Sequence, residues 1–243
     1  MEAKPDTLTA VLWPAEPVRK RGPKPSLSRQ QIIETAIEVA DASGLSAVTM
    51  QLLADQLGRP KMSLYRYLPG RDELVALMAD AALGAPPAAA GRGWRGRLRN
   101  WALQAWPVFL AHPWLHQVTV GPRVFGPNEL GWMEVALGAL DATDLTGAER
   151  LDAVALLTGH LRSMAAQRSA GPRSATDASA SDDIEAQSAA LMAQLLTDHA
   201  DRFPLTAAAF GQAQRTGTTD QALEFGLDRI LDGLGALIDR RRG

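Results

Sequence analysis

The sequence of 243 residues contains no cysteine, which excludes disulfides, thiolate metal sites and cysteine nucleophiles. Its four histidines are scattered along the chain and give little basis for a zinc site. It also lacks an apolar run of about eighteen residues and a charged-then-apolar leader, so we expect neither a membrane span nor secretion. We therefore expect a cytoplasmic globular protein without a metal or cofactor, for which 46% hydrophobic residues supply an ample core.

The motifs of common enzyme classes are missing as well. There is no Gly-x-Ser-x-Gly elbow, no phosphate-binding glycine loop and no His-Glu-x-x-His. Asp141, Asp144 and His160 could be combined into an acid–base set, but their spacing gives no reason to place them together. We therefore do not expect an enzyme.

Acidic residues are absent from residues 18–32, where the basic residues are Arg19, Lys20, Arg21, Lys24 and Arg29. This asymmetry, which the net charge of -2 conceals, points to a polyanionic partner. Residues 1–27 hold five prolines without apolar periodicity, so we expect an extended, mostly disordered arm. Arg19 and Arg21 could enter a minor groove of DNA; the alternative is an arm that only aids solubility.

Helical periodicity starts after the arm and predicts four helices, over residues 28–44, 49–58, 59–68 and 72–83. Ser28 with Gln31 forms a capping box for the first helix, and Thr49 can cap the second. The tight turn at Gly58 between the second and third helices predicts a helix-turn-helix, whose second helix lies in the major groove of DNA.

One side of this third helix is free for DNA. At 100° per residue, Leu64 and Leu68 fall together and are expected to face the core of the small domain. The opposite side carries Met62, Ser63, Arg66 and Tyr67, flanked by Lys61 and Tyr65. Arg66 can donate two hydrogen bonds to a guanine edge and Met62 can pack on a thymine methyl, while the flanking pair suits phosphates. The alternative is an ordinary exposed polar face.

The stretch IIETAIEVADASGLSAVTMQLLADQLGRPKMSLYRYLPGRDELVALM, residues 32–78, resembles the DNA-binding domain of the TetR family of transcriptional repressors. The agreement includes Gly-Leu after the first helix, a Thr starting the second, Leu-Ala-x-x-Leu-Gly, and Leu-Tyr in the third. Arg59 and Pro60 depart from the family pattern, and Pro60 offers no capping oxygen although its fixed φ suits a helix start. The resemblance implies DNA contacts by Thr49, Gln51, Lys61, Ser63, Tyr65, Tyr67 and Arg71, with Thr49 and Arg71 at phosphates.

Beyond an Ala/Pro/Gly-rich boundary at residues 83–93, helical patterns occupy residues 94–112, 128–141, 147–168, 183–203 and 219–240. Nothing reads as a strand. The Ala/Ser-rich segment of residues 169–183 is expected to be a mobile loop. The predicted fold is all-α, with the arm over residues 1–27, a helix-turn-helix domain with a linker helix over 28–83 and a larger helical domain over 84–243.

The second half is similar to the tetracycline-repressor subgroup in the segments GWRGRLRNWA, LAHPW, VGPR, LLTGH and EFGLDRILDGLGALI. This similarity implies an all-α domain that binds a small inducer and pairs with a second subunit. Independent evidence for a homodimer is an apolar seam formed by Leu223, Leu227, Ile230, Leu234 and Leu237. With residues 147–168 it could form a four-helix bundle between subunits, which would match a palindromic operator. The alternative is a core helix within one subunit.

Five of the six tryptophans lie within residues 94–132, as core filler or as the wall of a pocket for a flat, apolar or cationic ligand. With the resemblance, we predict a pocket lined by Trp101, Phe109, Thr119, Trp132, Leu156 and His160. Thr119 stands where the tetracycline repressor has a magnesium-binding histidine, and Trp101 replaces an asparagine that hydrogen-bonds the drug. We therefore predict a ligand other than tetracycline and no metal requirement, because one histidine cannot hold a hard cation.

These features together predict a ligand-responsive repressor that binds double-stranded operator DNA as a homodimer. An apolar, aromatic or cationic effector would act through the linker helix on the separation of the two recognition helices, about 34 Å in successive major grooves. The alternatives are an activator, or a dimeric DNA-binding regulator without a ligand whose C-terminal domain serves only for dimerisation.

Overall fold

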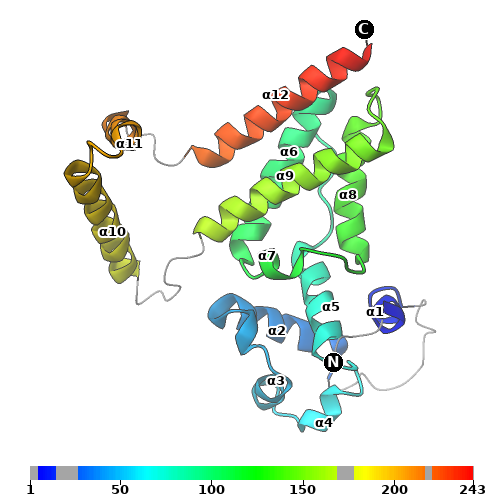
Figure 1. Ribbon diagram of the computed structural model, residues 1–243. Helices are drawn as coiled ribbons and strands as arrows, with labels where there is room; N and C mark the ends of the chain where they lie inside the picture. Colours follow the sequence, from blue (N-terminus) through cyan, green and yellow to red (C-terminus); the bar gives the residue numbers. More distant parts are fainter. Residues whose placement is uncertain (1–4, 15–26, 169–177, 217–220, 243) are drawn as a thin grey trace.

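The computed structural model describes residues 5–14, 27–168, 178–216 and 221–242, and within them the chain forms helices and no strand. The all-α prediction is confirmed. The α-helices are α1 (Pro5–Leu12), α2 (Arg29–Ser43), α3 (Met50–Gln56), α4 (Lys61–Leu64), α5 (Arg71–Leu83), α6 (Gly93–Ala111), α7 (Leu115–Val118), α8 (Pro127–Leu140), α9 (Gly147–Arg168), α10 (Ala178–Asp198), α11 (Pro204–Thr216) and α12 (Ala222–Arg242). Figure 1 shows α2, α3 and α4 as a small domain below a larger bundle of α6, α8, α9 and α12, with α5 running between them.

The small domain begins its helices where the local capping signals lie. Ser28 Oγ accepts a hydrogen bond from the backbone N of Gln31 at 3.1 Å, and the Gln31 side chain accepts one from the Ser28 N at 2.8 Å. The Thr49 hydroxyl accepts from Leu52 N at 3.1 Å at the start of α3. Gly44, with φ 80°, ends α2. The helices then enclose a core that includes Ile32, Ala36, Leu53, Leu64, Leu68, Leu74 and Met78, all buried.

Helix α5 belongs to both domains. It packs against α2 in the small domain and against α7 and α8 in the larger one. Leu74 and Met78 are completely buried, so the apolar face of α5 is continuous with the joint hydrophobic core. Helix α5 therefore packs into the cores of both domains.

An N-terminal helix is present where none was predicted. The sequence predicts no helix within residues 1–27, but α1 packs against α5 and buries Val11. Arg29 Nη2 donates a 2.7 Å hydrogen bond to the Val11 carbonyl, and Trp13 Nε1 donates a 2.9 Å bond to the Phe125 carbonyl. A helix of eight residues is marginal alone, so this one depends on tertiary contacts that the local sequence pattern does not reveal.

The larger domain is built on contacts of α6 with α8, α9 and α12. Its core includes Leu98, Trp101, Phe109, Leu140, Leu157 and Leu161. On the surface, Arg95 pairs with Asp232 at 2.7 Å and Arg99 with Glu224, which joins α6 to α12. Exposed pairs of this kind contribute at most about 1 kcal/mol each, so burial of the apolar faces is the main source of stability.

Helices α10 and α11 pack against each other and lie to one side of the bundle in Figure 1. Helix α10 starts at Ala178, so residues 178–183 of the predicted loop are helical, while residues 169–177 lie outside the described part. Helix α11 was not predicted, because its sequence PLTAAAFGQAQRT has few large apolar residues from which a period could be read.

The apolar seam predicted on α12 faces its own subunit in part. Leu227 and Leu234 are buried on the face of α12 that packs against α9 and α6, so their assignment to an intersubunit contact is wrong. A repeat of three and four residues marks any buried helix face and does not say which helix covers it. Leu223, Ile230 and Leu237 are partly buried at the edge of the same core.

Candidate DNA-binding face and effector cavity

The recognition helix α4 is a single turn over residues 61–64. Leu64 and Leu68 are completely buried, as predicted for the side that faces the core. Lys61, Tyr65 and Arg66 are exposed, and Met62 is 74% exposed. These side chains form an outward surface that offers two cations, an aromatic ring and the apolar side chain of Met62 together.

Tyr67 does not lie on this exposed surface. It packs partly buried against the hydrophobic core, so the prediction that it lies opposite Leu64 is wrong. The reason is angular: three residues at about 100° each place Tyr67 only about 60° from Leu64 around a regular helix, on the same side and not opposite it. Tyr67 N also bonds to the Leu64 carbonyl at 2.9 Å and Arg66 N to the Ser63 carbonyl at 3.4 Å, the i to i+3 pattern of a 3₁₀ turn, which brings Tyr67 closer still to the side of Leu64.

Several predicted DNA contacts have partners within the protein. The Ser63 hydroxyl donates to the Pro60 carbonyl at 2.6 Å, and Gln51 Nε2 donates to Asp55 at 2.9 Å. Both Ser63 Oγ and the Gln51 carbonyl keep lone pairs that can accept a bond. Thr49 Oγ1 accepts the bond that caps α3, and this bond does not use its O–H donor.

Arg71 has a clear structural role. Its Nε donates to the Val48 carbonyl at 3.2 Å and its Nη2 to the Leu45 carbonyl at 3.0 Å. These bonds tie the first turn of α5 to the segment between α2 and α3. A role at phosphate would use the remaining guanidinium donors. The two arm residues predicted to contact DNA, Arg19 and Arg21, lie outside the described residues.

A cavity of about 210 Å³ lies in the larger domain. Four of the six residues predicted for an effector pocket line it: Trp101, Phe109, Thr119 and Trp132. The rings of Trp101 and Trp132 meet edge to face with their centroids 6.1 Å apart. Trp101 Nε1 donates to the Trp132 carbonyl at 2.9 Å, which joins α6 to α8 and fixes both indoles in the wall.

The other two predicted pocket residues lie elsewhere, so these assignments are wrong. Leu156 is 54% exposed on the outside of α9. His160 Nε2 contacts the Leu223 carbonyl at 3.0 Å, and its ring packs so closely on α12 that a Cβ at Gly226 would collide with it. Helix α9 turns a different stripe toward the cavity, formed by Leu151, Val154, Ala155, Thr158 and Arg162.

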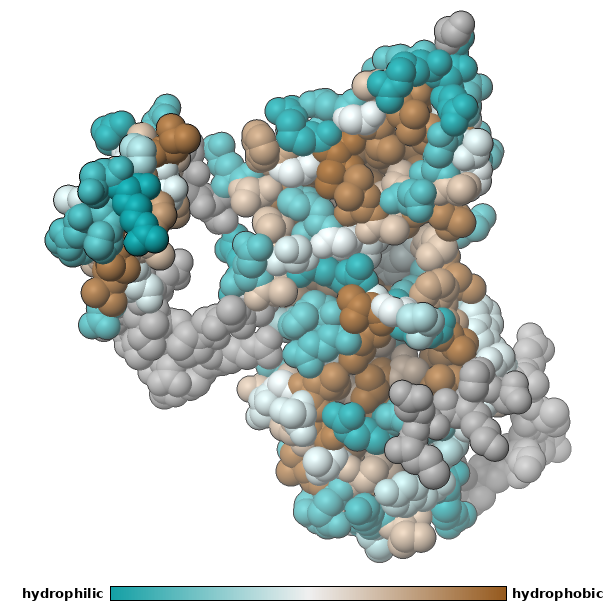
Figure 2. All heavy atoms as spheres, in the orientation of Figure 1, coloured by the Kyte–Doolittle hydropathy of each residue, from teal (hydrophilic) through white to brown (hydrophobic). Residues whose placement is uncertain are grey.

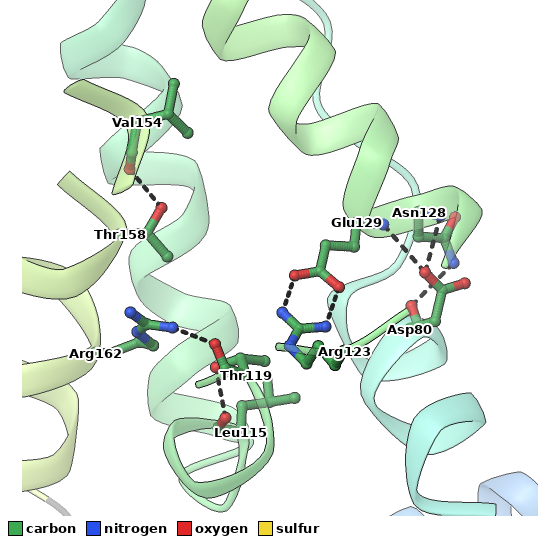
Figure 3. Close-up of polar contacts among 9 residues, drawn as sticks. All are labelled: Asp80, Leu115, Thr119, Arg123, Asn128, Glu129, Val154, Thr158 and Arg162. Carbon is green, nitrogen blue, oxygen red and sulfur yellow. Dashed lines mark hydrogen bonds and ion pairs between the residues drawn. The ribbon is translucent and has the colours of Figure 1, made fainter. Parts of the chain in front are cut away.

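The polar part of the cavity was not predicted. Figure 3 shows Arg123 paired through two bonds with Glu129, and Arg162 Nη1 donating to the Thr119 carbonyl. Burial lowers the pKa of the Arg162 guanidinium, and the neighbouring positive charge of Arg123 lowers it further. Thr119 Oγ1 donates to the Leu115 carbonyl at 2.7 Å. The cavity therefore joins an aromatic wall to a charged end.

Two hydrogen-bonded junctions connect the cavity wall with the last turn of α5. Trp132 Nε1 donates to the Leu83 and Gly84 carbonyls, each at 3.1 Å. One turn earlier on α8, the backbone N of Asn128 and that of Glu129 donate to Asp80 Oδ1 at 3.0 and 3.1 Å (Figure 3). Since Trp132 and Glu129 also line the cavity, both junctions start at residues that a ligand would touch.

Comparison with known proteins agrees with this architecture. The family model of bacterial regulatory proteins of the tetR family matches residues 32–78, and the model of the tetracyclin repressor-like C-terminal domain matches residues 85–238. The chain belongs to the TetR family. It is thus a DNA-binding transcriptional regulator, not an enzyme.

Relatives of this TetR-family regulator match over nearly its whole length. It is 34% identical over 241 residues to the HTH-type transcriptional repressor DrrR1 of Streptomyces coeruleorubidus, covering 96% of this chain and 86% of the relative. Structures of ActR from Streptomyces coelicolor, in complex with (S)-DNPA and with actinorhodin, align with TM-scores of 0.69 and 0.68 at 26% and 25% identity. They cover 87% and 89% of this chain, and 98% of each ActR chain.

The cavity of this TetR-family member does not fit a magnesium complex. No histidine lines it, and its single carboxylate, Glu129, is already paired with Arg123. A hard cation requires several oxygen ligands, and the second arginine adds repulsion. Among the residues that the structure describes, no three His, Cys, Asp or Glu side chains are grouped to hold a metal ion. In the same part of the chain, each helix is too short or too polar to cross a membrane.

Proposed function

We propose that the protein is a ligand-responsive repressor that binds a palindromic operator as a homodimer and releases it when a small aromatic effector fills the cavity. The observation that carries this proposal is the double role of Trp132. Its ring is part of the cavity wall, and its N–H holds the C-terminal end of the linker helix α5. An effector stacked against this ring alters the contact that positions α5.

Helix α5 leads directly to the DNA-binding face. Its first residue, Arg71, is bonded to the segment before α3, and Leu74 and Met78 are buried in the small-domain core. A shift of α5 therefore moves α3 and α4 as one body. In a dimer, this would change the separation of the two recognition helices, which must match successive major grooves about 34 Å apart.

The DNA contacts proposed for each subunit centre on Arg66. Arg66 is exposed at the end of the recognition turn and would read a guanine edge, while Met62 would pack on a neighbouring thymine methyl. Lys61 and Tyr65 would position the turn at phosphates. Tyr67, partly buried against the core, would have at most a peripheral role.

The proposed subunit contact lies on the outward faces of α9 and α12. Figure 2 shows hydrophobic side chains gathered over these two helices. The residues on these faces are Leu156, Gly159 and Ser163 of α9 and Ile230, Gly233 and Leu237 of α12. Small residues at Gly159 and Gly233 would allow close approach of the helices of a second copy, and Leu156, 54% exposed in one subunit, would be buried. This contact differs from the predicted seam by excluding Leu227 and Leu234.

Relatives support a small-molecule effector. The ActR structures were obtained with (S)-DNPA and with actinorhodin, so a protein of this architecture accommodates such compounds. For the present chain, the cavity volume, the paired indoles and the junctions to α5 favour an aromatic effector over a regulator that responds to no ligand.

The experiment is to replace Trp132 with Phe, which keeps an aromatic ring in the wall but removes the N–H that holds α5. Operator fragments would first be selected from random DNA with the full chain. An effector would be found by screening compounds for quenching of tryptophan fluorescence. Its affinity for the variant should stay within a few fold of that for the parent, but it should release the variant less completely from the operator. Trp106→Phe, on α6 and outside the cavity lining, is the matched control. Failure of every aromatic compound to bind would favour the ligand-free alternative.

A further inference from the structure

The charged side chains of the cavity are unbalanced. Arg123 and Arg162 both line it, whereas Glu129 is the one carboxylate among its lining residues. Glu129 uses both of its oxygens on Arg123 (Figure 3). Within the described residues, Arg162 has no carboxylate partner and donates to a backbone carbonyl, that of Thr119. The cavity therefore carries one positive charge in excess.

Donor groups in the same place also lack acceptors. The buried Nε of Arg123 has no hydrogen-bond partner, although buried polar groups in native proteins are normally paired. A guanidinium has five N–H donors and no acceptor, so Arg162 also retains unused donors. Burial and the charge of Arg123 both lower the pKa of Arg162, and the carboxylate of Glu129, which is bonded to Arg123, opposes them only in part.

A neutral ligand would leave this imbalance in place, and a cationic one would increase it. An anion would supply both the missing charge and the missing acceptors. Hydrogen bonds between a guanidinium and an anionic oxygen are the stronger, shorter class, and they are often bidentate. The aromatic part of the cavity wall, formed by Trp101, Phe109 and Trp132, suits the body of such a ligand.

We propose that the effector is an aromatic acid, whose carboxylate or phenolate binds Arg162, with Arg123 beside it, while its ring system packs against Trp101 and Trp132. This inference rests on the proposed effector cavity and narrows the chemistry of its ligand. It replaces the cationic class of effector that the tryptophan cluster alone would allow.

The test uses two probes with the same ring system, anthraquinone-2-carboxylate and anthraquinone-2-carboxamide, each titrated into the full chain at pH 7.5. Binding is followed by quenching of tryptophan fluorescence. The carboxylate should bind at least about tenfold more tightly than the carboxamide, which corresponds to about 1.4 kcal/mol. Raising the salt concentration should reduce this preference only weakly, because partly buried charges are poorly screened.

Three variants assign the preference to a residue. Arg162→Gln should lower the affinity for the carboxylate to that for the carboxamide, and Arg162→Lys, which retains the charge, should keep part of the preference. Arg168→Gln makes the same change of charge on the same helix outside the cavity lining and should leave the preference intact. Unfolding curves of the variants identify any loss of binding that follows from loss of structure.

Each other outcome contradicts the inference in a distinct way. Equal affinities of the two probes for the unaltered chain would refute anion recognition and leave the cavity as an effector site. Loss of the preference in Arg168→Gln as large as in Arg162→Gln would show that net charge, and not Arg162, sets it. No quenching by either probe would refute this inference, whereas the proposed function would fail only if no aromatic compound of any charge bound.

Discussion

The N-terminus of α8 is capped by a residue from another helix, and removing this cap should cost measurable stability. Asp80 of α5 accepts hydrogen bonds from the backbone N of Asn128 and of Glu129, while Asn128 Nδ2 donates to the Asp80 carbonyl at 2.9 Å. Gly126 precedes α8 without a side-chain cap of its own, and a Cβ there would collide with the Asp80 carboxylate. Asp80 is 9% exposed, so water cannot readily replace it.

The magnitude follows from these contacts. Asp80→Ala leaves two backbone N–H groups with little access to water, and an unpaired buried donor costs about 1–3 kcal/mol. Loss of an N-cap typically costs about 0.5–2 kcal/mol. This cost overlaps with that of the unpaired donors, so the two are not simply added. We therefore expect the free energy of unfolding to fall by about 2–4 kcal/mol. For a chain of this size, each kcal/mol lowers the melting temperature by about 2–4 °C.

Asp80→Asn is the informative comparison, because its amide oxygen can still accept from both backbone groups. We expect it to change stability by less than about 1 kcal/mol. Both variants would be measured by urea and thermal unfolding of the full chain, with Asp239→Ala, at an exposed position of α12, as a control for loss of a carboxylate. An Asp80→Ala variant within about 0.5 kcal/mol of the parent, or an Asn variant as unstable as the Ala variant, would refute the capping role.

The same carboxyl predicts a pH dependence with a defined sign. Burial raises the pKa of Asp80, against the opposing effect of its bonds to Glu129 and Asn128. A carboxyl whose folded-state pKa is raised contributes stability that is complete below its unfolded pKa of about 3.9 and lost as pH rises through the folded value. Asp80→Asn has no such loss. The stability of the Asn variant relative to the parent should therefore increase as pH rises through that interval.

Three further predictions concern DNA and subunit contacts. Arg66→Ala should cost about 1–3 kcal/mol on the selected operator and little on random duplex, whereas Lys61→Ala should weaken both alike; equal losses for Arg66→Ala would show that it contacts phosphate. Leu156→Asp should convert the dimer to a monomer by light scattering, since it places a charge in an apolar contact, and an unchanged mass would place the interface elsewhere. If the arm neutralises phosphates, replacing Arg19 and Arg21 with Gln should reduce the slope of log K against log[salt] by about 0.9 per lost contact; an unchanged slope would exclude the arm from the complex.

Local signals explain which parts of the fold could be predicted. Capping residues and glycine stops lie within a few residues of the helix ends that they determine, so α2 and α3 were predicted together with their N-caps, Ser28 and Thr49. Helix α1 has no such local signal, because it is held by contacts with Arg29, Phe125 and α5. Its existence is a tertiary property that no window of sequence contains.

The residues that line the candidate pocket were harder to predict, for a different reason. Helix α9 is covered by α6, α7, α8 and α12 and also borders the cavity, so apolar residues occur around most of its circumference. Periodicity then cannot say which stripe faces the ligand, and the prediction chose Leu156 and His160 on the wrong sides. The arginines had no signal either, since a charged side chain on a helix or loop is ordinarily exposed to water.

The two junctions between the cavity and the linker helix suggest how the signal divides. In the first junction, Asp80 of α5 accepts hydrogen bonds from the first turn of α8. In the second, Trp132, one turn later on α8, donates to the C-terminal end of α5. If the junctions act in parallel, Asp80→Asn, which keeps the cap, should retain the coupling between effector and operator, while Asp80→Ala and Trp132→Phe should each remove part of it. Their losses in coupling free energy, out of a usual total of about 1–3 kcal/mol, should then add in the double variant. If the double variant loses no more coupling free energy than either single variant, α8 and α5 instead move as one rigid contact. Breaking either junction is then enough to release that contact.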